Sequence, residues 1–484
     1  MVVKEMSRRG AAALLFAGIL ALKLLLLALL GPLMAPDTPA YVEYATAIMA
    51  DAGWRTRADL GATFAPNLVF RMMGFPLVVA GFKSLSASHW QWLFVGFQIV
   101  IAVLATCRLF VVLDRISGNR NLALGLAVAQ ATAINIAFDQ FVLTDGLYLA
   151  LMMFATCSIV EISLDRAVST YRLFEISALF AGCFFLREAT STLILLWIPL
   201  LVIALSRAMS LRGAALVAAL VVMPVFASQF AYKSWNQYRT GERFVTTSYQ
   251  LVLLQPLVKA YRYDKAIFGG DELLDRVARQ HVSRYHYDEV VVVGDALHRE
   301  HGWNALHSAR EIERRFWKAW REHPGAMLRA TGDRLKFGYT MILVEPLSSV
   351  NFLVNWISAA NNNAVSFGTL TRKTFKEGRI WYAPLWLFDL ACRLASILIL
   401  VSIMAGAAYL AWRIRTFATL PLALEALALT ALAGGFIGAH VIVHLEERYM
   451  MPIVPVGLMV FAFLVRNRGA LLEAWRGAPA TVAT

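Results

Sequence analysis

Residues 10–33 form the apolar run GAAALLFAGILALKLLLLALLGPL, and the polar turn MAPDTPAY follows at 34–41. About 20 apolar residues are enough for a helix to cross the hydrocarbon core of a bilayer. The run comes after Lys4, Arg8 and Arg9, as in a signal sequence. It is too long for a signal sequence, and Pro36 disfavours cleavage. We therefore expect an uncleaved first span that starts in the cytoplasm.

The rest of the chain repeats this pattern. Of its 484 residues, 59% are hydrophobic and only 16% are charged, whereas soluble domains carry about 25% charged residues. This composition excludes a disordered chain, a collagen, a coiled coil and a small disulfide scaffold. The sequence predicts an all-α polytopic membrane protein with about ten transmembrane helices, outer-face juxtamembrane helices and a mainly helical extracytoplasmic insertion. The further predicted spans are 90–113, 121–138, 146–164, 172–187, 190–206, 213–231, 384–412, 418–440 and 449–465.

One apolar segment, 69–88, is not assigned as a span. Gly74 and Pro76 interrupt it, which favours a broken segment that lies along the outer membrane face or re-enters the membrane. If it does not cross, every short cytoplasmic loop is basic, as the positive-inside rule requires. The basic residues of these loops are Arg108, Arg115, Arg120, Arg166, Arg172, Arg207, Arg212, Arg413, Arg415, Arg466, Arg468 and Arg476.

This topology leaves two long regions outside, 34–89 and 232–383. We therefore expect a transmembrane module at 1–231 that includes the loop 34–89, an extracytoplasmic domain at 232–383, and C-terminal spans with a cytoplasmic tail at 384–484. Within the domain, Ser308–Arg334 has helical periodicity that places Ile312, Phe316, Ala319 and Trp320 on one face. His323-Pro324-Gly325 is expected to end that helix. An apolar piece, 337–358, is a candidate for dipping into the bilayer.

The distribution of charge and the positions of the cysteines narrow the range of possible functions. The net charge of +13 is scattered along a membrane chain, which argues against nucleic acid as a partner. Ten of the 45 basic residues are Lys and the rest are Arg, a bias that a GC-rich genome or phosphate recognition by guanidinium groups would produce. All four Cys lie in apolar runs and show neither a disulfide framework nor zinc-ligand spacing.

Two aspartates stand where predicted spans meet the outer face. Asp37 follows the first span, and Asp145 precedes the span at 146–164. Either carboxylate is also suited to cap the helix after it, and Asp139 competes for any role given to Asp145. Intramembrane and juxtamembrane charges are nonetheless costly and often functional.

Three cations are predicted at the same face. Arg187 and Glu188 form a short charged hairpin, and Arg71 lies on the interfacial segment, where it could also simply reach lipid phosphates. Arg448 lies in Glu446-Glu447-Arg448-Tyr449 before the last span.

His440 and His444 precede that motif at helical spacing. A metal pair is conceivable there, but local hydrogen bonds are the more common fate of such residues. The His residues between 281 and 323 match no metal signature and are expected to be solvated.

Taken together, these motifs resemble the GT-C glycosyltransferases of the bacterial membrane, in particular the protein O-mannosyltransferase and lipid A aminoarabinose transferase branch. The resemblance covers the order of spans over most of the chain. Its motifs are Pro36-Asp37-Thr38-Pro39-Ala40-Tyr41, the segment Arg71 to Pro76, Asp145 in Thr-Asp-x-x-Tyr, the pair at 187–188, and Glu447-Arg448-Tyr449-x-x-Pro452. Many relatives have Glu directly after the first Asp; here Thr38 follows Asp37, and Glu43 is the nearest Glu.

The resemblance implies transfer of a sugar from a polyprenyl-phosphate donor to a lipid, polysaccharide or protein hydroxyl. It places the chain in the bacterial inner membrane, with both termini cytoplasmic and a periplasmic active site. It assigns Asp37 as the catalytic base and Asp145 as the second acidic residue, with Arg71 on the donor phosphate. Arg187 and Arg448 are further proposed phosphate clamps. The side chains expected to bind substrate are Tyr41, Glu188, His444, Glu447 and Tyr449.

One base is chemically sufficient, because a phosphate leaving group needs cations and no general acid. Some relatives place a divalent cation between the two carboxylates and others use none; Asp37 and Asp145 would be its ligands here. Two alternatives stay open: a transporter or flippase for lipid-linked substrates, and an O-antigen-type polymerase or ligase. The sequence shows no inverted repeat, and a 150-residue outer insertion is unusual in a transporter.

Overall fold

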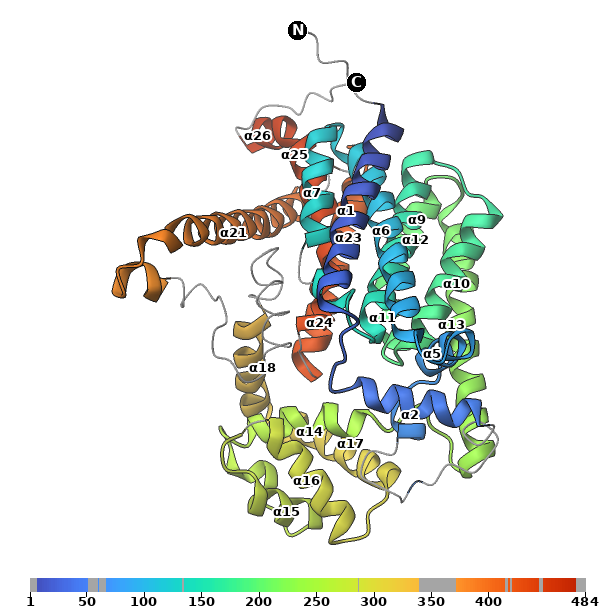
Figure 1. Cartoon of the computed structure of the whole chain (residues 1–484), viewed down its shortest axis with the longest axis vertical. Helices are drawn as coiled ribbons and strands as arrows, with labels where there is room; N and C mark the ends of the chain where they lie inside the picture. Colours follow the sequence, from blue (N-terminus) through green and yellow to red (C-terminus); the bar gives the residue numbers. More distant parts are fainter. Residues whose placement is uncertain are drawn as a thin grey trace.

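A computed structural model describes residues 7–50, 60, 67–132, 135–285, 287–338, 371–413, 417, 420–443 and 447–475. In these residues regular structure is helical, apart from one isolated β-bridge between Leu33 and Phe141. The all-α prediction is confirmed. Figure 1 shows long helices running side by side and a smaller helical domain at one end of them.

The bundle begins with α1 (Arg8–Leu30), α6 (Trp90–Ser117) and α7 (Arg120–Thr132). It continues through α9 (Thr144–Asp165), α10 (Thr170–Leu186), the run α11, η1 and α12 (Thr190–Ser206), and α13 (Leu211–Thr240). It closes with α23 (Ala423–Val443) and α25 (Ile453–Arg466). Nearly every residue of α9 is buried, so α9 is the centre of the bundle, packed by α6, α10 and α12.

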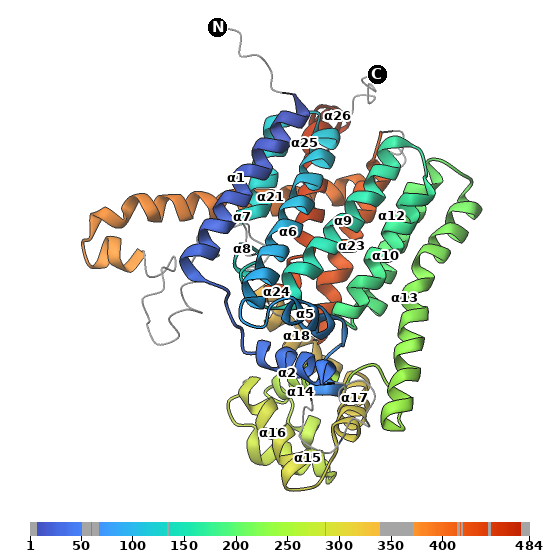
Figure 2. The same ribbon diagram turned by 45° about the vertical axis from the view of Figure 1, so that its right-hand side comes forward.

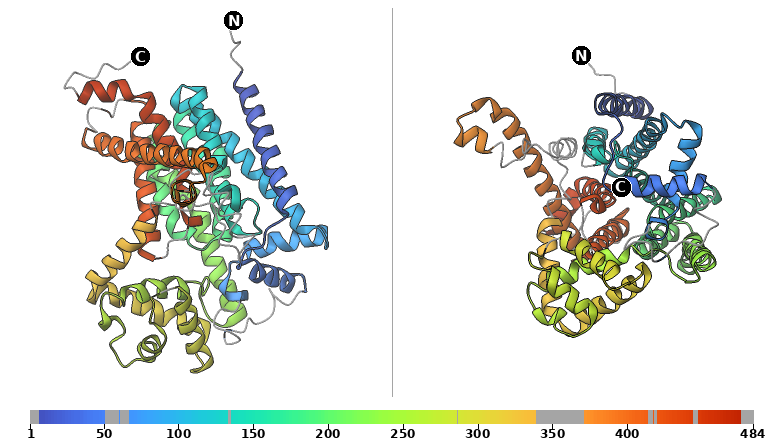
Figure 3. Two further views of the ribbon diagram at one scale, coloured as in Figure 1. Left: turned by 60° about the vertical axis from the view of Figure 1, so that its left-hand side comes forward. Right: turned by 60° about the horizontal axis from the view of Figure 1, so that its bottom comes forward.

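Six helices of the described chain are long and apolar enough to cross a membrane: α1, α6, α9, α13, the helix ending at Trp412, and α23. The outer faces of α1 and α13 expose large apolar side chains such as Leu29 and Leu216, which suits contact with lipid. The protein is therefore a polytopic helical membrane protein. One predicted span differs in orientation. Helix α21 (Ala383–Trp412) packs on α23 and α25 through its C-terminal part and projects crosswise from the bundle in Figures 1 and 3.

The segment 69–88 does not cross the bundle. It forms the short helices α4 (Asn67–Phe70) and α5 (Gly74–Leu85), and α5 has only twelve residues. Figures 1 and 2 show α5 crosswise at the bundle end, where it packs on α2 (Thr38–Met49). A Cβ atom on Gly74 would lie 2.3 Å from the Phe185 carbonyl oxygen, so glycine lets α5 approach the end of α10 directly.

The second unit has its own apolar core and consists of α14 (Tyr249–Ala260), η2 (Lys265–Phe268), α15 (Leu273–His281), α16 (Tyr287–Arg299), α17 (Ala305–Glu322) and α18 (Pro324–Gly338). Helix α17 buries Ile312, Phe316 and Ala319, with Trp320 partly buried against the same core, as its periodicity predicted, and it ends at Glu322, just before His323-Pro324-Gly325. Helix α13 runs nine residues past the predicted boundary at 231, so this α14–α18 domain begins later than expected. Most of the apolar piece 337–358 lies outside the described residues.

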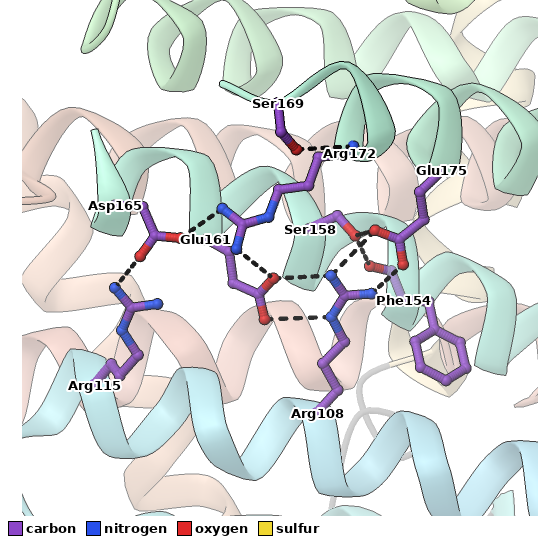
Figure 4. Close-up of polar contacts among 9 residues, drawn as sticks. All are labelled: Arg108, Arg115, Phe154, Ser158, Glu161, Asp165, Ser169, Arg172 and Glu175. Carbon is purple, nitrogen blue, oxygen red and sulfur yellow. Dashed lines mark hydrogen bonds and ion pairs between the residues drawn. The ribbon is translucent and has the colours of Figure 1, made fainter. Parts of the chain in front are cut away.

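The domain covers one end of the bundle, which we call the domain end (Figure 3). The start of α1 and the last helix, α26 (Arg468–Trp475), lie at the opposite end, the termini end (Figure 1). At the termini end, α6, α9 and α10 are joined by an ion-pair cluster shown in Figure 4. We call it the Arg108 cluster; its charged members are Arg108, Arg115, Glu161, Asp165, Arg172 and Glu175.

Candidate active site

A cavity of about 590 Å³ lies at the domain end, between the bundle and the α14–α18 domain. This volume is typical of sites for small molecules. Its walls come from α2, the α4–α5 junction, the start of α9, the α10–α11 junction, the start of α14, the end of α23 and α24 (Glu447–Met450). The polar residues of the wall are Asp37, Tyr41, Arg71, Thr144, Arg187, Glu188, Thr192, Ser248, Tyr249, His440 and Tyr449.

Asp37 sits at the start of α2 but makes no capping bond to that helix. Its Oδ1 accepts a hydrogen bond of 2.7 Å from the Arg71 guanidinium. The Thr38 hydroxyl accepts a bond from the Ala35 amide and donates to the Val142 carbonyl, which ties the turn to the segment before α9. In the structure, Asp37 therefore pairs with Arg71 and does not cap α2.

Arg71 is held from several sides. Its guanidinium lies 5.1 Å from the centre of the Tyr41 ring and 4.9 Å from that of Phe70. Such stacking restrains a guanidinium group and leaves its edges open for hydrogen bonds. Burial raises the pKa of the Tyr41 phenol while Arg71 acts in the opposite direction, so Tyr41 stays a neutral donor.

Arg187 is the second cation of the cavity. It lies between two rings, 5.2 Å from Tyr148 and 4.9 Å from Tyr449, and it bonds the carboxylate of Asp145. Asp145 is only 1% exposed and is not part of the cavity wall. Asp145 lies behind Arg187, and the role given to it as the second acidic residue stays a prediction. Asp145 lies in the first turn of α9, where its carboxylate accepts a hydrogen bond from the Arg187 guanidinium.

Glu188 also faces the cavity, held by two hydroxyl groups. Its Oε1 accepts from Ser248 and, at 3.2 Å, from Thr246. These hydroxyls stand just before α14, so the bonds connect the α10–α11 junction to the domain. Beside them, burial raises the pKa of Tyr249 to about 12, which keeps this phenol protonated.

The last wall is only partly described. Tyr449 lies on it, and the His440 Nδ1–H donates a 2.9 Å hydrogen bond to the Phe436 carbonyl, the local bonding expected of it. His444 lies outside the described residues, as do the side chains of Glu447 and Arg448. Their predicted roles stay predictions.

A buried ion pair that the sequence analysis missed supports the site from below. Lys23, in the middle of α1, pairs with Asp139, and both side chains are fully buried. The Gln98 amide donates to the carbonyls of Phe138, Asp139 and Phe141 at 3.1–3.2 Å. Together they hold the segment that leads into Asp145. A lone Lys inside an apolar run is the signal that would have found this pair.

The arrangement does not suit a divalent cation between Asp37 and Asp145. Each carboxylate bonds a different guanidinium, and Asp145 is behind the wall. Among the described residues, no group of three or more His, Cys, Asp or Glu could hold a metal ion. What the cavity presents is two stacked arginines and two carboxylates, Asp37 and Glu188, around one space.

Comparisons with known proteins add little to this geometry. No family model matches the chain. No curated protein matches it. Among solved structures, the chain is similar to ArnT from Cupriavidus metallidurans bound to undecaprenyl phosphate, with 13% identity and a TM-score of 0.35 over 96% of this chain and 80% of that one.

Proposed function

We propose that this protein is a membrane glycosyltransferase that moves a sugar from a polyprenyl phosphate to a hydroxyl group. The observation that supports this is the single cavity in which Arg71 and Arg187 stand beside two carboxylates. Guanidinium groups bind phosphate oxygens in pairs, and a carboxylate takes a proton. Such a transfer requires stabilisation of the leaving phosphate and removal of the proton from the acceptor hydroxyl.

The reaction would be an inverting displacement. The acceptor oxygen attacks the anomeric carbon, the bond from that carbon to the phosphate oxygen breaks, and the electron pair leaves with the polyprenyl phosphate. Arg71 and Arg187 would neutralise the leaving group, and Arg448 is a further candidate. A carboxylate on the wall would take the acceptor proton; Asp37 is the candidate from sequence, and Glu188 is the other.

Asp145 would act through Arg187. As a buried carboxylate bonded to that guanidinium, it would fix the direction of Arg187 and compensate its charge. Tyr41 and Tyr449 would contact the donor next to the arginines that stack on them. The acceptor would be a lipid, a glycan or a protein of the cell envelope.

The positive-inside rule would put the termini end, with its basic loops, in the cytoplasm of a bacterial inner membrane. The cavity would then open at the periplasmic face. The donor chain would lie in the outer leaflet, and the α14–α18 domain would stand over the reaction in the periplasm.

The test is direct. Purified protein in lipid nanodiscs is given undecaprenyl-phosphate glucose, mannose or 4-amino-4-deoxyarabinose, with an envelope lipid and glycan extract as the source of hydroxyl groups. We expect release of undecaprenyl phosphate and a glycosylated product from at least one donor. Movement of an intact donor between leaflets without product would favour the flippase alternative, and no release from any donor would contradict the proposal.

A further inference from the structure

The two carboxylates on the cavity wall are bonded in different ways. Asp37 uses Oδ1 to bind the Arg71 guanidinium, a cation that the proposed reaction needs for phosphate. Glu188 is bonded through Oε1 to the hydroxyls of Ser248 and Thr246. In the part of the chain that the structure describes, no cationic side chain forms an ion pair with Glu188, and its Oε2 is not among the buried polar atoms that lack a hydrogen-bond partner.

This difference matters for proton transfer. A base needs a lone pair that points at the acceptor hydroxyl and is not occupied by a cation. A carboxylate bonded to a guanidinium instead fixes the position of that cation, as Asp145 does for Arg187. Asp37 and Arg71 repeat the same pairing between the start of α2 and the α4–α5 junction.

Resting on the proposed function, we infer that Glu188 is the catalytic base and that Asp37 is a positioning residue for Arg71. Glu188 Oε2 takes the proton of the acceptor hydroxyl as that oxygen bonds to the anomeric carbon. The carbon–oxygen bond to phosphate breaks, and its electron pair leaves with the polyprenyl phosphate between Arg71 and Arg187. Glu188 becomes a neutral acid and returns the proton to water.

The location of Glu188 also assigns sides to the two substrates. Its hydroxyl partners belong to the segment just before α14, so Glu188 faces the α14–α18 domain. Arg71 lies between α4 and α5, and Arg187 lies between α10 and α11, on the bundle side of the cavity. The acceptor hydroxyl would therefore enter from the domain side and the lipid donor from the bundle side.

Azide tests the assignment, because it is already an anion and attacks the anomeric carbon without giving up a proton. With a donor that wild type uses, transfer to hydroxyl acceptor by Glu188→Gln should fall by about 10²–10⁴-fold. Transfer to added sodium azide, measured as glycosyl azide, should stay within about threefold of the wild-type azide rate. Undecaprenyl phosphate binding and melting temperature serve as controls for the folded cavity.

Asp37→Asn is the matched variant. It should raise the KM for donor more than it lowers kcat, and azide should not restore it, because the defect lies in the phosphate contacts. The inference is overturned if Glu188→Gln keeps wild-type transfer, or if azide restores Asp37→Asn and not Glu188→Gln. Either result leaves the proposed function intact. The proposed function itself fails only if the wild-type protein transfers sugar from no donor.

Discussion

The two ends of the bundle each have a cavity lined by arginine and carboxylate side chains, and they use these charges differently. The cavity at the termini end, about 610 Å³, is lined by members of the Arg108 cluster. There Arg108 bonds both Glu161 and Glu175, and Asp165 accepts 2.5 Å bonds from Arg115 and Arg172 (Figure 4). The charges satisfy one another.

The domain end has a cavity of similar volume but another organisation. Each of its arginines pairs with one carboxylate and lies against two aromatic rings, and Glu188 is bonded by hydroxyls. Its walls come from segments that are far apart in sequence, whereas the Arg108 cluster joins only α6, α9 and α10. Similar residue types and similar volumes can therefore serve a structural cluster at one end and a candidate active site at the other.

The largest expected effect tests the structural side of this comparison. Arg108→Ala should destabilise the protein by about 3–5 kcal/mol, because it leaves Glu161 and Glu175 without their shared cation. Thermal unfolding in detergent micelles measures this loss. The rate of sugar transfer by the folded fraction should not change.

A triple variant is the control for Arg108. Arg108→Met combined with Glu161→Gln and Glu175→Gln removes cation and carboxylates together and should regain most of the stability. If Arg108→Ala unfolds like wild type but loses transfer, the two ends of the bundle do not differ as we describe.

The next effect tests the functional side. Arg71→Ala should lower transfer by about 10²–10³-fold, because a preorganised cation is lost from the leaving phosphate. Its melting temperature should stay close to that of wild type, since Arg71 and Asp37 are both partly exposed. Steady-state kinetics with the preferred donor give the measurement, and Arg71→Lys should retain part of the rate. A wild-type rate in Arg71→Ala would exclude the phosphate role.

A smaller effect concerns the stacked rings. Tyr449→Leu should weaken binding of undecaprenyl phosphate by about 3–30-fold, because a cation–π contact with Arg187 contributes about 0.5–2 kcal/mol. Titration in nanodiscs measures the affinity. Tyr238→Leu is the matched control, since Tyr238 is 81% exposed on α13 and should bind as wild type does. Equal affinities of the two variants would show that the stack does not orient Arg187.

The smallest expected effect concerns an exposed ion pair in the α14–α18 domain. Arg314→Gln removes an exposed bond to Glu272 and should cost only a few tenths of a kcal/mol at pH 7. The hydrogen bond from Arg314 lowers the pKa of Glu272 below its usual 4.5. This stabilisation is therefore present above about pH 4.5 and is lost as the pH falls through the lowered pKa. The difference in stability between wild type and variant should shrink as the pH falls below 4.5; a difference that stays constant with pH would contradict this origin.

The sequence predicted the architecture well for a physical reason. Spans need long apolar runs, and the charge rule kept the broken segment 69–88 out of the predicted spans, so this segment was expected to lie along the outer membrane face or to re-enter. The periodicity of 308–334 likewise identified the buried face of α17. The crosswise direction of α21 was missed, because an apolar composition shows that a helix can cross a membrane but does not determine how the helix is oriented in the fold.

The sequence grouped several residues that line the cavity, and it did not predict how their charges pair. Asp37, Arg71, Arg187 and Glu188 were expected at one face because each stands beside a predicted span end. The pairing of Asp37 with Arg71, and of Asp145 with Arg187, depends on distances between segments separated by 34 and 42 residues. No local pattern encodes such distances.

By itself, then, the sequence determined that this chain is a helical membrane protein with acidic and basic side chains at span ends, because hydrophobic burial and charge desolvation act on composition and local order. Only the tertiary structure decided which carboxylate neutralises which arginine. That choice follows from how α2, α5, α10 and α14 pack around one space, and it leaves Glu188 as the carboxylate bonded by hydroxyl groups.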